Sequence, residues 1–218
     1  MLARRHFIKT SAALFGAAVL PQTAFASSGQ WNAWDAQITP VNFDLYSSNP
    51  WGIHPRFLPR LVEANAGLTP GDIHVDPVAR YLYHIREDGL AMRFGVAIAK
   101  GNLYEPGVYT IKRKARWPGW TPTAAMIARE PEVYAQYEDG MPGGPDNPLG
   151  SRALYLYDGP RDTYLRIHGT NEPRSIGGRA SSGCVRMIMA HINALYPMVD
   201  RGVRAHLHDA NTLRTATS

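Results

Sequence analysis

Residues 163–187, TYLRIHGTNEPRSIGGRASSGCVRM, decide how the fold and chemistry of this chain are interpreted. The segment begins with alternating apolar residues, a pattern typical of a half-buried β-strand, and this run ends at His168. A loop with three glycines follows and carries Cys184, the single cysteine of the chain. Glycine permits backbone angles and close approaches that other residues resist. The pattern predicts that a strand end and a flexible-backbone loop bring an imidazole and a thiol together.

This pair has the chemistry of an activated nucleophile. The thiolate is the reactive form, and a thiol of pKa about 8.5 is only slightly ionised near neutral pH unless a neighbouring imidazole takes its proton. We expect Cys184 to be the nucleophile and His168 the general base and then the general acid. The N–H groups of Gly183 and Cys184 are candidates for an oxyanion hole. The residues alone leave a structural alternative open, in which His168 caps a strand and Cys184 fills the core.

Apolar residues at helical spacing predict a helix over residues 187–199. If that helix begins just after Cys184, its positive end would lower the pKa of the thiol further.

Short alternating segments with turn signals between them surround this unit. They predict strands over residues 72–76, 80–85, 90–99, 107–111, 153–157, 163–168 and 203–208. Residues 124–137 can hold a helix interrupted by Pro131, and a short helix is expected at residues 59–66. Residues 141–150 contain three Gly and three Pro and are expected to be loop. Five to seven strands with few helices predict a mainly β sandwich or barrel.

Residues 1–26 have the features of a targeting segment. The start is basic (Arg4, Arg5 and Lys9), an apolar run covers residues 12–20, and a small-x-small cleavage site ends at Ala26. The run is shorter than the roughly 20 residues of a membrane-spanning helix, so a permanent anchor is the weaker alternative. The two arginines resemble the twin-arginine export signal, with an ordinary secretory signal as the other possibility. Either signal predicts that the mature protein works outside the cytoplasm, in the periplasm.

Charge and cysteine content narrow the function classes. The whole chain has 23 basic and 18 acidic residues, and removal of residues 1–26 leaves 20 basic and 18 acidic, a net charge of +2. That balance gives no indication of nucleic acid or of a polybasic membrane contact. In an oxidising compartment, a single cysteine has no internal disulfide partner. Cys184 is therefore a free thiol, an intermolecular link or a buried apolar group.

The motif His168-Gly169-Thr170 followed by SSGCVRM at residues 181–187 closely resembles the signature of the L,D-transpeptidase catalytic domain, or YkuD domain. A looser resemblance covers residues 71–208. It implies a mainly β fold, a β-sandwich of the L,D-transpeptidase (YkuD) type with a few short helices. It also implies that Cys184 attacks the bond between meso-diaminopimelate and the terminal D-Ala of a tetrapeptide stem. D-Ala leaves, a thioester forms, and an amine resolves it.

The resemblance also assigns further roles and partners. The candidate substrate-binding residues are Arg186, Ser182, Ser181 and Thr170. Arg186 could alternatively brace the loop. The expected partners are peptidoglycan stems that contain meso-diaminopimelate, with an outer-membrane protein as a possible acceptor. No cofactor, metal, nucleic acid or stable membrane anchor is expected. The chain would divide into a signal peptide (1–26), an N-terminal extension (27–70), a catalytic domain (71–209) and a C-terminal tail (210–218).

Four details of the site stay open. Many family members have His where this chain has Ser182, so a role for that His does not transfer. The group that orients His168 is expected to be a backbone carbonyl or a hydroxyl, with Ser181 and Ser175 as candidates. Trp117 and Trp120 either cover the cleft or pack within a Pro-rich loop, and residues 143–150 could form a flap.

Three alternative functions remain. Water could resolve the same thioester, which would make the protein a carboxypeptidase or an endopeptidase. A non-catalytic wall-binding module could keep the fold without thiol reactivity. A zinc peptidase is the most distant alternative, because His206 and His208 share a strand face but lack an evident third ligand.

Overall fold

The computed structural model describes residues 27–215, so the predicted signal peptide lies outside the described residues. Strands hold 33% and helices 23% of the described residues, which confirms the mainly β prediction. The described part contains eleven strands, not five to seven. The additional strands are mostly two to four residues long, too short for alternation to be recognised in sequence. No helix within residues 27–215 is long and apolar enough to span a membrane.

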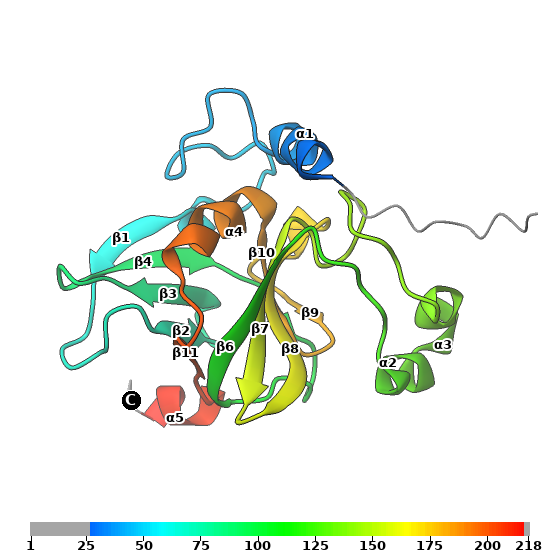
Figure 1. Ribbon diagram of the computed structural model, residues 1–218. Coiled ribbons are helices and arrows are strands. Elements are labelled where there is room, and N and C mark those ends of the chain that lie inside the picture. The colour runs from blue at the N-terminus through cyan, green and yellow to red at the C-terminus, as the bar shows by residue number, and fades with distance from the viewer. Residues whose placement is uncertain (1–26, 216–218) are drawn as a thin grey trace, which may run out of the picture.

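Nine strands form one sheet in the order β1-β4-β3-β2-β11-β6-β7-β8-β10, and β5 pairs with β9 in a second, small sheet (Figure 1). Neighbouring strands in the large sheet are antiparallel except for the parallel pairs β2–β11 and β8–β10. The strands are β1 (Arg60–Glu63), β2 (Ile73–Asp76), β3 (Tyr81–Ile85), β4 (Leu90–Gly95), β5 (Ile98–Ala99), β6 (Gly107–Arg116), β7 (Arg152–Asp158), β8 (Arg161–Thr170), β9 (Arg179–Ser181), β10 (Val185–Ile188) and β11 (Arg204–Leu207).

The helices are short and lie at the margins of the sheet (Figure 1). They are α1 (Ser28–Ile38), α2 (Ala124–Arg129), α3 (Pro131–Tyr134), α4 (Met189–Leu195) and α5 (Ala210–Thr215), with 3-10 turns η1 (Pro55–Phe57), η2 (Ala135–Tyr137), η3 (Pro173–Ser175) and η4 (Tyr196–Met198). The expected interruption at Pro131 is confirmed, because α2 ends before it and α3 begins with it.

One helix prediction is wrong, and another places the helix start two residues too early. Residues 59–66 contain no helix, because Arg60–Glu63 pairs with β4 along its whole length and this pairing overrides the local pattern. The helix predicted over residues 187–199 begins only at Met189, since residues 185–188 form β10 beside β8. The predicted strand over residues 90–99 is divided between β4 and β5.

A shared core joins the two halves of the large sheet into a sandwich. Apolar side chains from β2, β3 and β4 meet apolar side chains from β7, β8 and β10 in one cluster, which includes the fully buried residues Ile73, Leu82, Phe94, Leu154, Ile167 and Val185. Helix α4 closes one end of this core with Ile192 and Leu195. The buried apolar area that holds the halves together is the main stabilising term of the fold.

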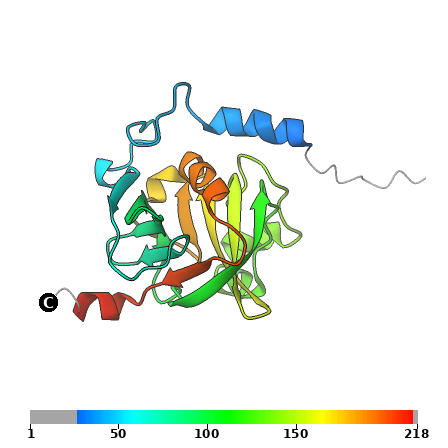
Figure 2. The same cartoon turned by 60° about the vertical axis from the view of Figure 1, so that its left-hand side comes forward.

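The N-terminal extension packs on the domain. Figure 2 shows α1 lying across one end of the sandwich, far from α5. Further along, Phe57 joins a second apolar cluster with Ile176, next to the glycine-rich loop. Gly177 has φ +87°, and a Cβ there would stand 2.2 Å from the Phe57 ring, so only glycine fits. The extension therefore supports the loop that leads to Cys184.

Candidate active site

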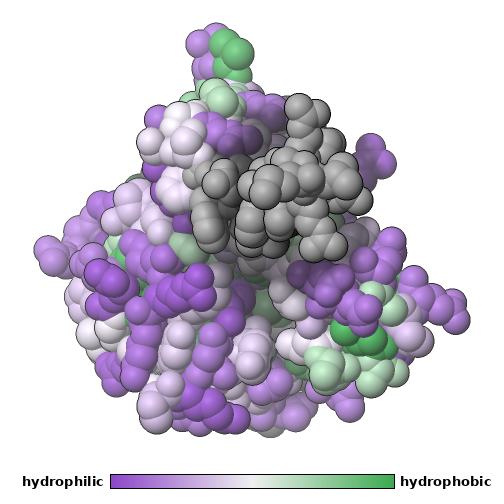
Figure 3. Space-filling view, turned by 45° about the vertical axis from the view of Figure 1, so that its right-hand side comes forward, coloured by the Kyte–Doolittle hydropathy of each residue, from purple (hydrophilic) through white to green (hydrophobic). Residues whose placement is uncertain are grey.

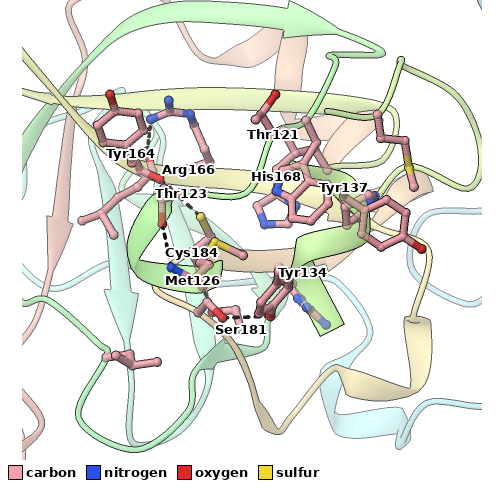
Figure 4. Close-up of a pocket in the computed structure, with 18 of the residues that line it drawn as sticks. Thr121, Thr123, Met126, Tyr134, Tyr137, Tyr164, Arg166, His168, Ser181 and Cys184 are labelled. Atoms are coloured by element: carbon pink, nitrogen blue, oxygen red, sulfur yellow. Dashed lines mark hydrogen bonds between the residues drawn. The ribbon is translucent and has the colours of Figure 1, made fainter. Parts of the chain in front are cut away.

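Strands β8 and β10 divide their side chains between two faces, as the period of two requires. One face sends four apolar side chains into the core: Leu165, Ile167, Val185 and Met187. The other face lines a cleft of about 750 Å³. Arg166 and His168 come from β8, whereas Cys184 directly precedes β10 and Arg186 lies in it. Figure 4 shows Arg166, His168 and Cys184 in this cleft. The parallel register pairs Arg186 with His168. Cys184, two residues earlier, therefore lies one diagonal step from His168, as the sequence pattern predicts.

His168 is held by the backbone. Its ring is 4% exposed, and Nδ1 lies 2.5 Å from the carbonyl oxygen of Gly169. A carbonyl oxygen only accepts, so Nδ1 carries the proton and Nε2 of the neutral ring keeps its lone pair. Burial lowers the pKa of His168 to about 3, with help from the charge of Arg186 and against the Gly169 hydrogen bond. The ring is thus a neutral base near pH 7.

The serine candidates for orienting His168 are wrong. The Ser181 hydroxyl donates to the Cys184 carbonyl at 2.5 Å, and the Ser175 hydroxyl donates to the Glu172 carbonyl at 2.7 Å. Both hydroxyls stabilise the loop instead of the imidazole.

A glycine makes room for the backbone behind His168. Gly150 has φ +63°, and a Cβ there would stand 2.9 Å from the carbonyl carbon of Gly169. The preceding residue, Leu149, also supplies a backbone contact that favours the protonated ring. The loop over residues 141–150 therefore forms the back wall of the His168 site.

The Cys184 thiol is protonated at rest. Its Sγ–H donates to the Tyr164 carbonyl at 3.7 Å, and its burial raises the pKa, which the backbone and charge of Arg166 and the charge of Arg186 only partly offset. The expected helix N-terminus is absent at this point, because a strand follows Cys184. Cys184 and His168 consequently form a neutral thiol–imidazole pair.

The turn before Cys184 is closed by its own serine. The Gly183 N–H points at the Ser181 hydroxyl at 3.4 Å, and that hydroxyl donates in turn to the Cys184 carbonyl. The Gly183 N–H, a predicted oxyanion-hole donor, is therefore directed at Ser181 in this structure. The contact is long enough to be weak.

Arg186 and Thr170 belong to one network. Arg186 donates to Glu172 at 2.6 Å, and its side chain is 17% exposed while that of Glu172 is 64% exposed. Thr170 is 3% exposed, does not line the cleft, and accepts from the Glu172 N–H at 3.0 Å. The structure does not bring Thr170 to the substrate side. It shapes the turn that places Glu172 against Arg186.

Helices α2 and α3 supply the roof of the cleft, a role that the sequence did not indicate for these two helices. The Tyr134 hydroxyl lies 3.2 Å from Ser182 Oγ, so α3 contacts the residue next to Gly183. Trp120 and Tyr137 also line the cleft, with ring centroids 5.8 Å apart. Trp117 lies outside it, 4% exposed, and donates to Asp35 of α1 at 3.1 Å. The covering role thus fits Trp120 and the packing role fits Trp117.

Two more residues of the cleft carry no motif signal. Tyr164 has φ +61° although it is not glycine, and it is 68% exposed beside Cys184. Such strain is concentrated at functional sites. Arg166 is 8% exposed and forms two hydrogen bonds to Asp162, at 2.6 and 2.9 Å. The one signal for it in the sequence is a charged residue between the apolar Leu165 and Ile167.

The surface on the side of α2 and α3 is mainly hydrophilic, with a small apolar patch (Figure 3). Within residues 27–215, no group of three or more His, Cys, Asp or Glu side chains is arranged to hold a metal ion. His206 and His208 contact other side chains instead: His206 lies 3.1 Å from Asp72, and His208 lies 3.0 Å from His74.

A mainly β domain that presents a thiol and a neutral imidazole on one wall of a cleft belongs to the class of proteins with a cysteine–histidine site. The model of the L,D-transpeptidase catalytic domain (YkuD) family matches residues 70–207. The chain belongs to this family, as the motif around Cys184 predicts.

Among curated proteins, the chain is similar to the probable L,D-transpeptidase YbiS of Escherichia coli K12, with 39% identity over 99 residues. That match covers 45% of this chain and 31% of YbiS, so the chain spans about a third of that relative's length. Among solved structures, the Ldtfm–avibactam carbamoyl enzyme shares the fold with 15% identity and a TM-score of 0.50 over 65% of this chain and 50% of the other. A Brucella melitensis structure described as a probable carnitine operon oxidoreductase is 47% identical over 70% of this chain and 94% of the other, with a TM-score of 0.49.

Proposed function

We propose that this protein is a periplasmic L,D-transpeptidase that transfers peptidoglycan tetrapeptide stems through a thioester on Cys184. The observation that carries the proposal is the placement of Cys184 and His168 on one cleft wall, from adjacent strands, in a chain of this family. The acyl group would come from the residue before the terminal D-Ala, meso-diaminopimelate. The acceptor amine would come from a second stem, giving a 3–3 cross-link, or from an outer-membrane protein.

The neutral state of the pair sets the order of proton transfer. His168 keeps its Nε2 lone pair because its pKa lies near 3, and the Cys184 thiol keeps its proton because burial raises its pKa. Nε2 therefore takes the thiol proton as Sγ attacks the carbonyl carbon, instead of forming an ion pair beforehand. The resulting imidazolium donates this proton to the leaving amine of D-Ala. The imidazole then takes a proton from the acceptor amine that attacks the thioester. It passes this proton to the departing Cys184 sulfur, which restores the neutral pair.

The neighbouring groups support these steps. Arg186 places a positive charge beside His168, which favours return of the proton to the leaving group. The Gly183 and Cys184 N–H groups would stabilise the tetrahedral oxyanion once the Gly183 N–H leaves Ser181. Ser182 and Tyr134 would contact the bound stem from the roof of the cleft.

The location follows from residues 1–26, which we propose are an export signal of the twin-arginine type. A cleavable signal would release the domain where peptidoglycan is assembled, without a membrane anchor.

Incubation of the protein with a disaccharide-tetrapeptide, followed by mass spectrometry of the products, tests the proposal. We expect a dimer that has lost one D-Ala, and no dimer with the Cys184→Ala variant. Tripeptide alone would indicate a carboxypeptidase or the need for a protein acceptor. An unchanged substrate would contradict the proposal and favour a wall-binding module.

A further inference from the structure

A row of side chains leads across the sheet from Cys184. The register pairs Arg113 of β6 with Tyr155 of β7, and Tyr155 with Arg166 of β8. The pairing of β8 with β10, extended by one residue, then puts Cys184 beside Arg166. All four side chains line the same cleft. The row is therefore a continuous strip of the cleft wall that begins at the nucleophile and ends at Arg113.

A β-bulge turns Arg113 toward this strip. The register between β6 and β7 shifts between Ile111 and Arg113, so Lys112 is an extra residue in β6. Ile111 is fully buried in the core, whereas Lys112 and Arg113 are both exposed. Arg113 lines the cleft and Lys112 does not. A bulge that redirects a side chain beside an active site is a recurrent structural device.

The far end of the strip carries more positive than negative charge. The guanidinium groups of Arg113 and Arg166 lie 4.3 and 4.1 Å from the centroid of the Tyr155 ring. Asp162 accepts two hydrogen bonds from Arg166. Within residues 27–215, Arg113 forms no ion pair. Two fixed cations and one carboxylate leave a cationic site that faces the cleft.

We propose that Arg113, supported by Tyr155 and Arg166, binds a free carboxylate of an acidic peptide stem. Adjacent strands are about 4.8 Å apart, so the Cα atoms of Cys184 and Arg113 are separated by three steps, about 14 Å. The Arg113 side chain spans part of this distance. An extended peptide advances roughly 3.3 Å per residue, so the carboxylate should lie about two residue lengths from the acylated carbonyl. The α-carboxylate of a glutamate that precedes the acylated residue and is joined to it through its side-chain carboxyl has about this reach. This position rests on the proposed reaction at Cys184.

Binding of two probes tests the subsite independently of catalysis. The Cys184→Ala protein, with and without Arg113→Gln, would be titrated with a disaccharide-tetrapeptide that has a free D-glutamate α-carboxylate, and with the same molecule amidated at that carboxylate. We expect Arg113→Gln to weaken binding of the acidic probe about fivefold, the effect of a partly exposed ion pair, and to leave the amidated probe unchanged. Lys112→Gln removes the same charge one residue away and should change neither affinity.

Equal losses of affinity for both probes, or no loss, would overturn this assignment for the acyl donor.

A carboxylate on the acceptor would have the same chemistry, so acylation and transfer are also measured separately. Slower acylation of Cys184 by a donor stem whose diaminopimelate amine is acetylated, in Arg113→Gln but not in Lys112→Gln, would place the bound carboxylate on the donor. The alternative result is normal acylation of Arg113→Gln followed by slower transfer to the acceptor. If an acceptor amidated at its carboxylate is used equally fast by Arg113→Gln and the wild type, the bound carboxylate belongs to the acceptor. Absence of all these effects overturns the subsite. A wild-type protein that binds but is never acylated contradicts the proposed function instead, and the binding comparison still decides the subsite.

Discussion

The two sides of the cleft differ in how firmly they are held. The wall made by β8 and β10 is buried over residues 165–170 and packs on the main core. The roof made by α2 and α3 has no buried residue in either helix. It reaches the rest of the protein through contacts such as the Tyr134–Ser182 hydroxyl pair and the Lys100–Glu130 ion pair at 2.7 Å.

This difference separates chemistry from access. The reacting groups lie on strands with a fixed register, which keeps their mutual geometry constant. A segment with few buried contacts opens at a lower free-energy cost than a core strand. We therefore expect changes in the wall to affect the rate of acylation or the stability of the fold, and changes in the roof to affect substrate binding.

The largest effect is expected from His168→Ala in the wall. Loss of the base should reduce the acylation rate of Cys184 at pH 7 by about 10²- to 10⁴-fold. Partial recovery is expected at high pH, where the thiolate forms without help. In the wild type, the His168 pKa near 3 predicts no inflection from this ring between about pH 4 and 8. Acylation rates measured by intact mass across this pH range check both statements. An unchanged rate at pH 7 would exclude His168 as the base.

The next effect is expected where α1 braces β7, the strand next to the wall. Asp35 accepts from Arg152 at 2.9 and 2.6 Å, and the Arg152 side chain is only 9% exposed. Asp35→Ala would leave this buried charge without its partner, so the free energy of unfolding should fall by about 2–3 kcal/mol in urea denaturation. Asp44→Ala is the matched control, because Asp44 forms its hydrogen bonds only within residues 44–48 of the same extension.

The Asp35 contribution should also depend on pH. Burial tends to raise the pKa of Asp35, but the hydrogen bonds and charges of Arg152 and Arg116 outweigh it and lower the pKa below 3.8. The stabilisation is therefore complete above about pH 3.8 and is lost as the pH falls through the lowered pKa. If Asp35→Ala were as stable as Asp44→Ala, the brace would have no energetic role.

A smaller effect is expected from His191, which lies on α4 behind the wall. The ring is fully buried, and neither nitrogen has a hydrogen-bond partner among the described residues. Burial lowers its pKa to about 3, so the unfolded chain takes up a proton below about pH 6.5 and the folded chain does not. Stability is consequently lost as the pH falls from about 6.5 toward 3.

His191→Leu removes this proton uptake and the unpaired polar atoms. Its stability at pH 7 should be equal to that of the wild type or higher by about 1 kcal/mol, with a smaller loss between pH 7 and pH 5. Urea denaturation at the two pH values measures this difference. An undiminished loss at pH 5 would mean that other groups, such as His74, whose pKa burial lowers to about 4, account for the acid sensitivity.

The smallest effect is expected in the roof. Tyr134→Phe removes the hydroxyl that meets Ser182, and should change stability by less than about 1 kcal/mol. It should raise KM a few-fold with little change in kcat, and Ser182→Ala should not add to it. A fall in kcat similar to that of His168→Ala would show that the roof takes part in the chemistry and would break the comparison.

The features that sequence reasoning predicted correctly are local ones. Alternation of apolar and polar residues defines the strands. The same period of two residues puts His168 and Cys184 on the face opposite the core. The helix start was misplaced because Val185 and Met187 fit a strand, while the apolar residues that follow Met187 continue at helical spacing. The pKa of Cys184 consequently follows its burial, not a helix end.

The features that were missed depend on long-range contacts. Asp35 and Arg152 are 117 positions apart, and Tyr134 and Ser182 are 48 apart, so no local pattern connects them. The orientation of Arg113 depends on a bulge that appears only when β6 pairs with β7. Thr170 was assigned to substrate because it belongs to the motif, yet its hydroxyl serves the turn that holds Glu172.

The intact mass of the protein during reaction with a disaccharide-tetrapeptide whose free diaminopimelate amine is acetylated, so that it cannot serve as acceptor, tests the central proposal most directly. We predict a covalent adduct equal to the stem minus D-Ala on Cys184, absent in Cys184→Ala and slow to form in His168→Ala. A wild-type protein that releases products without any adduct on Cys184, or a Cys184→Ala variant that retains turnover, would contradict the thioester mechanism.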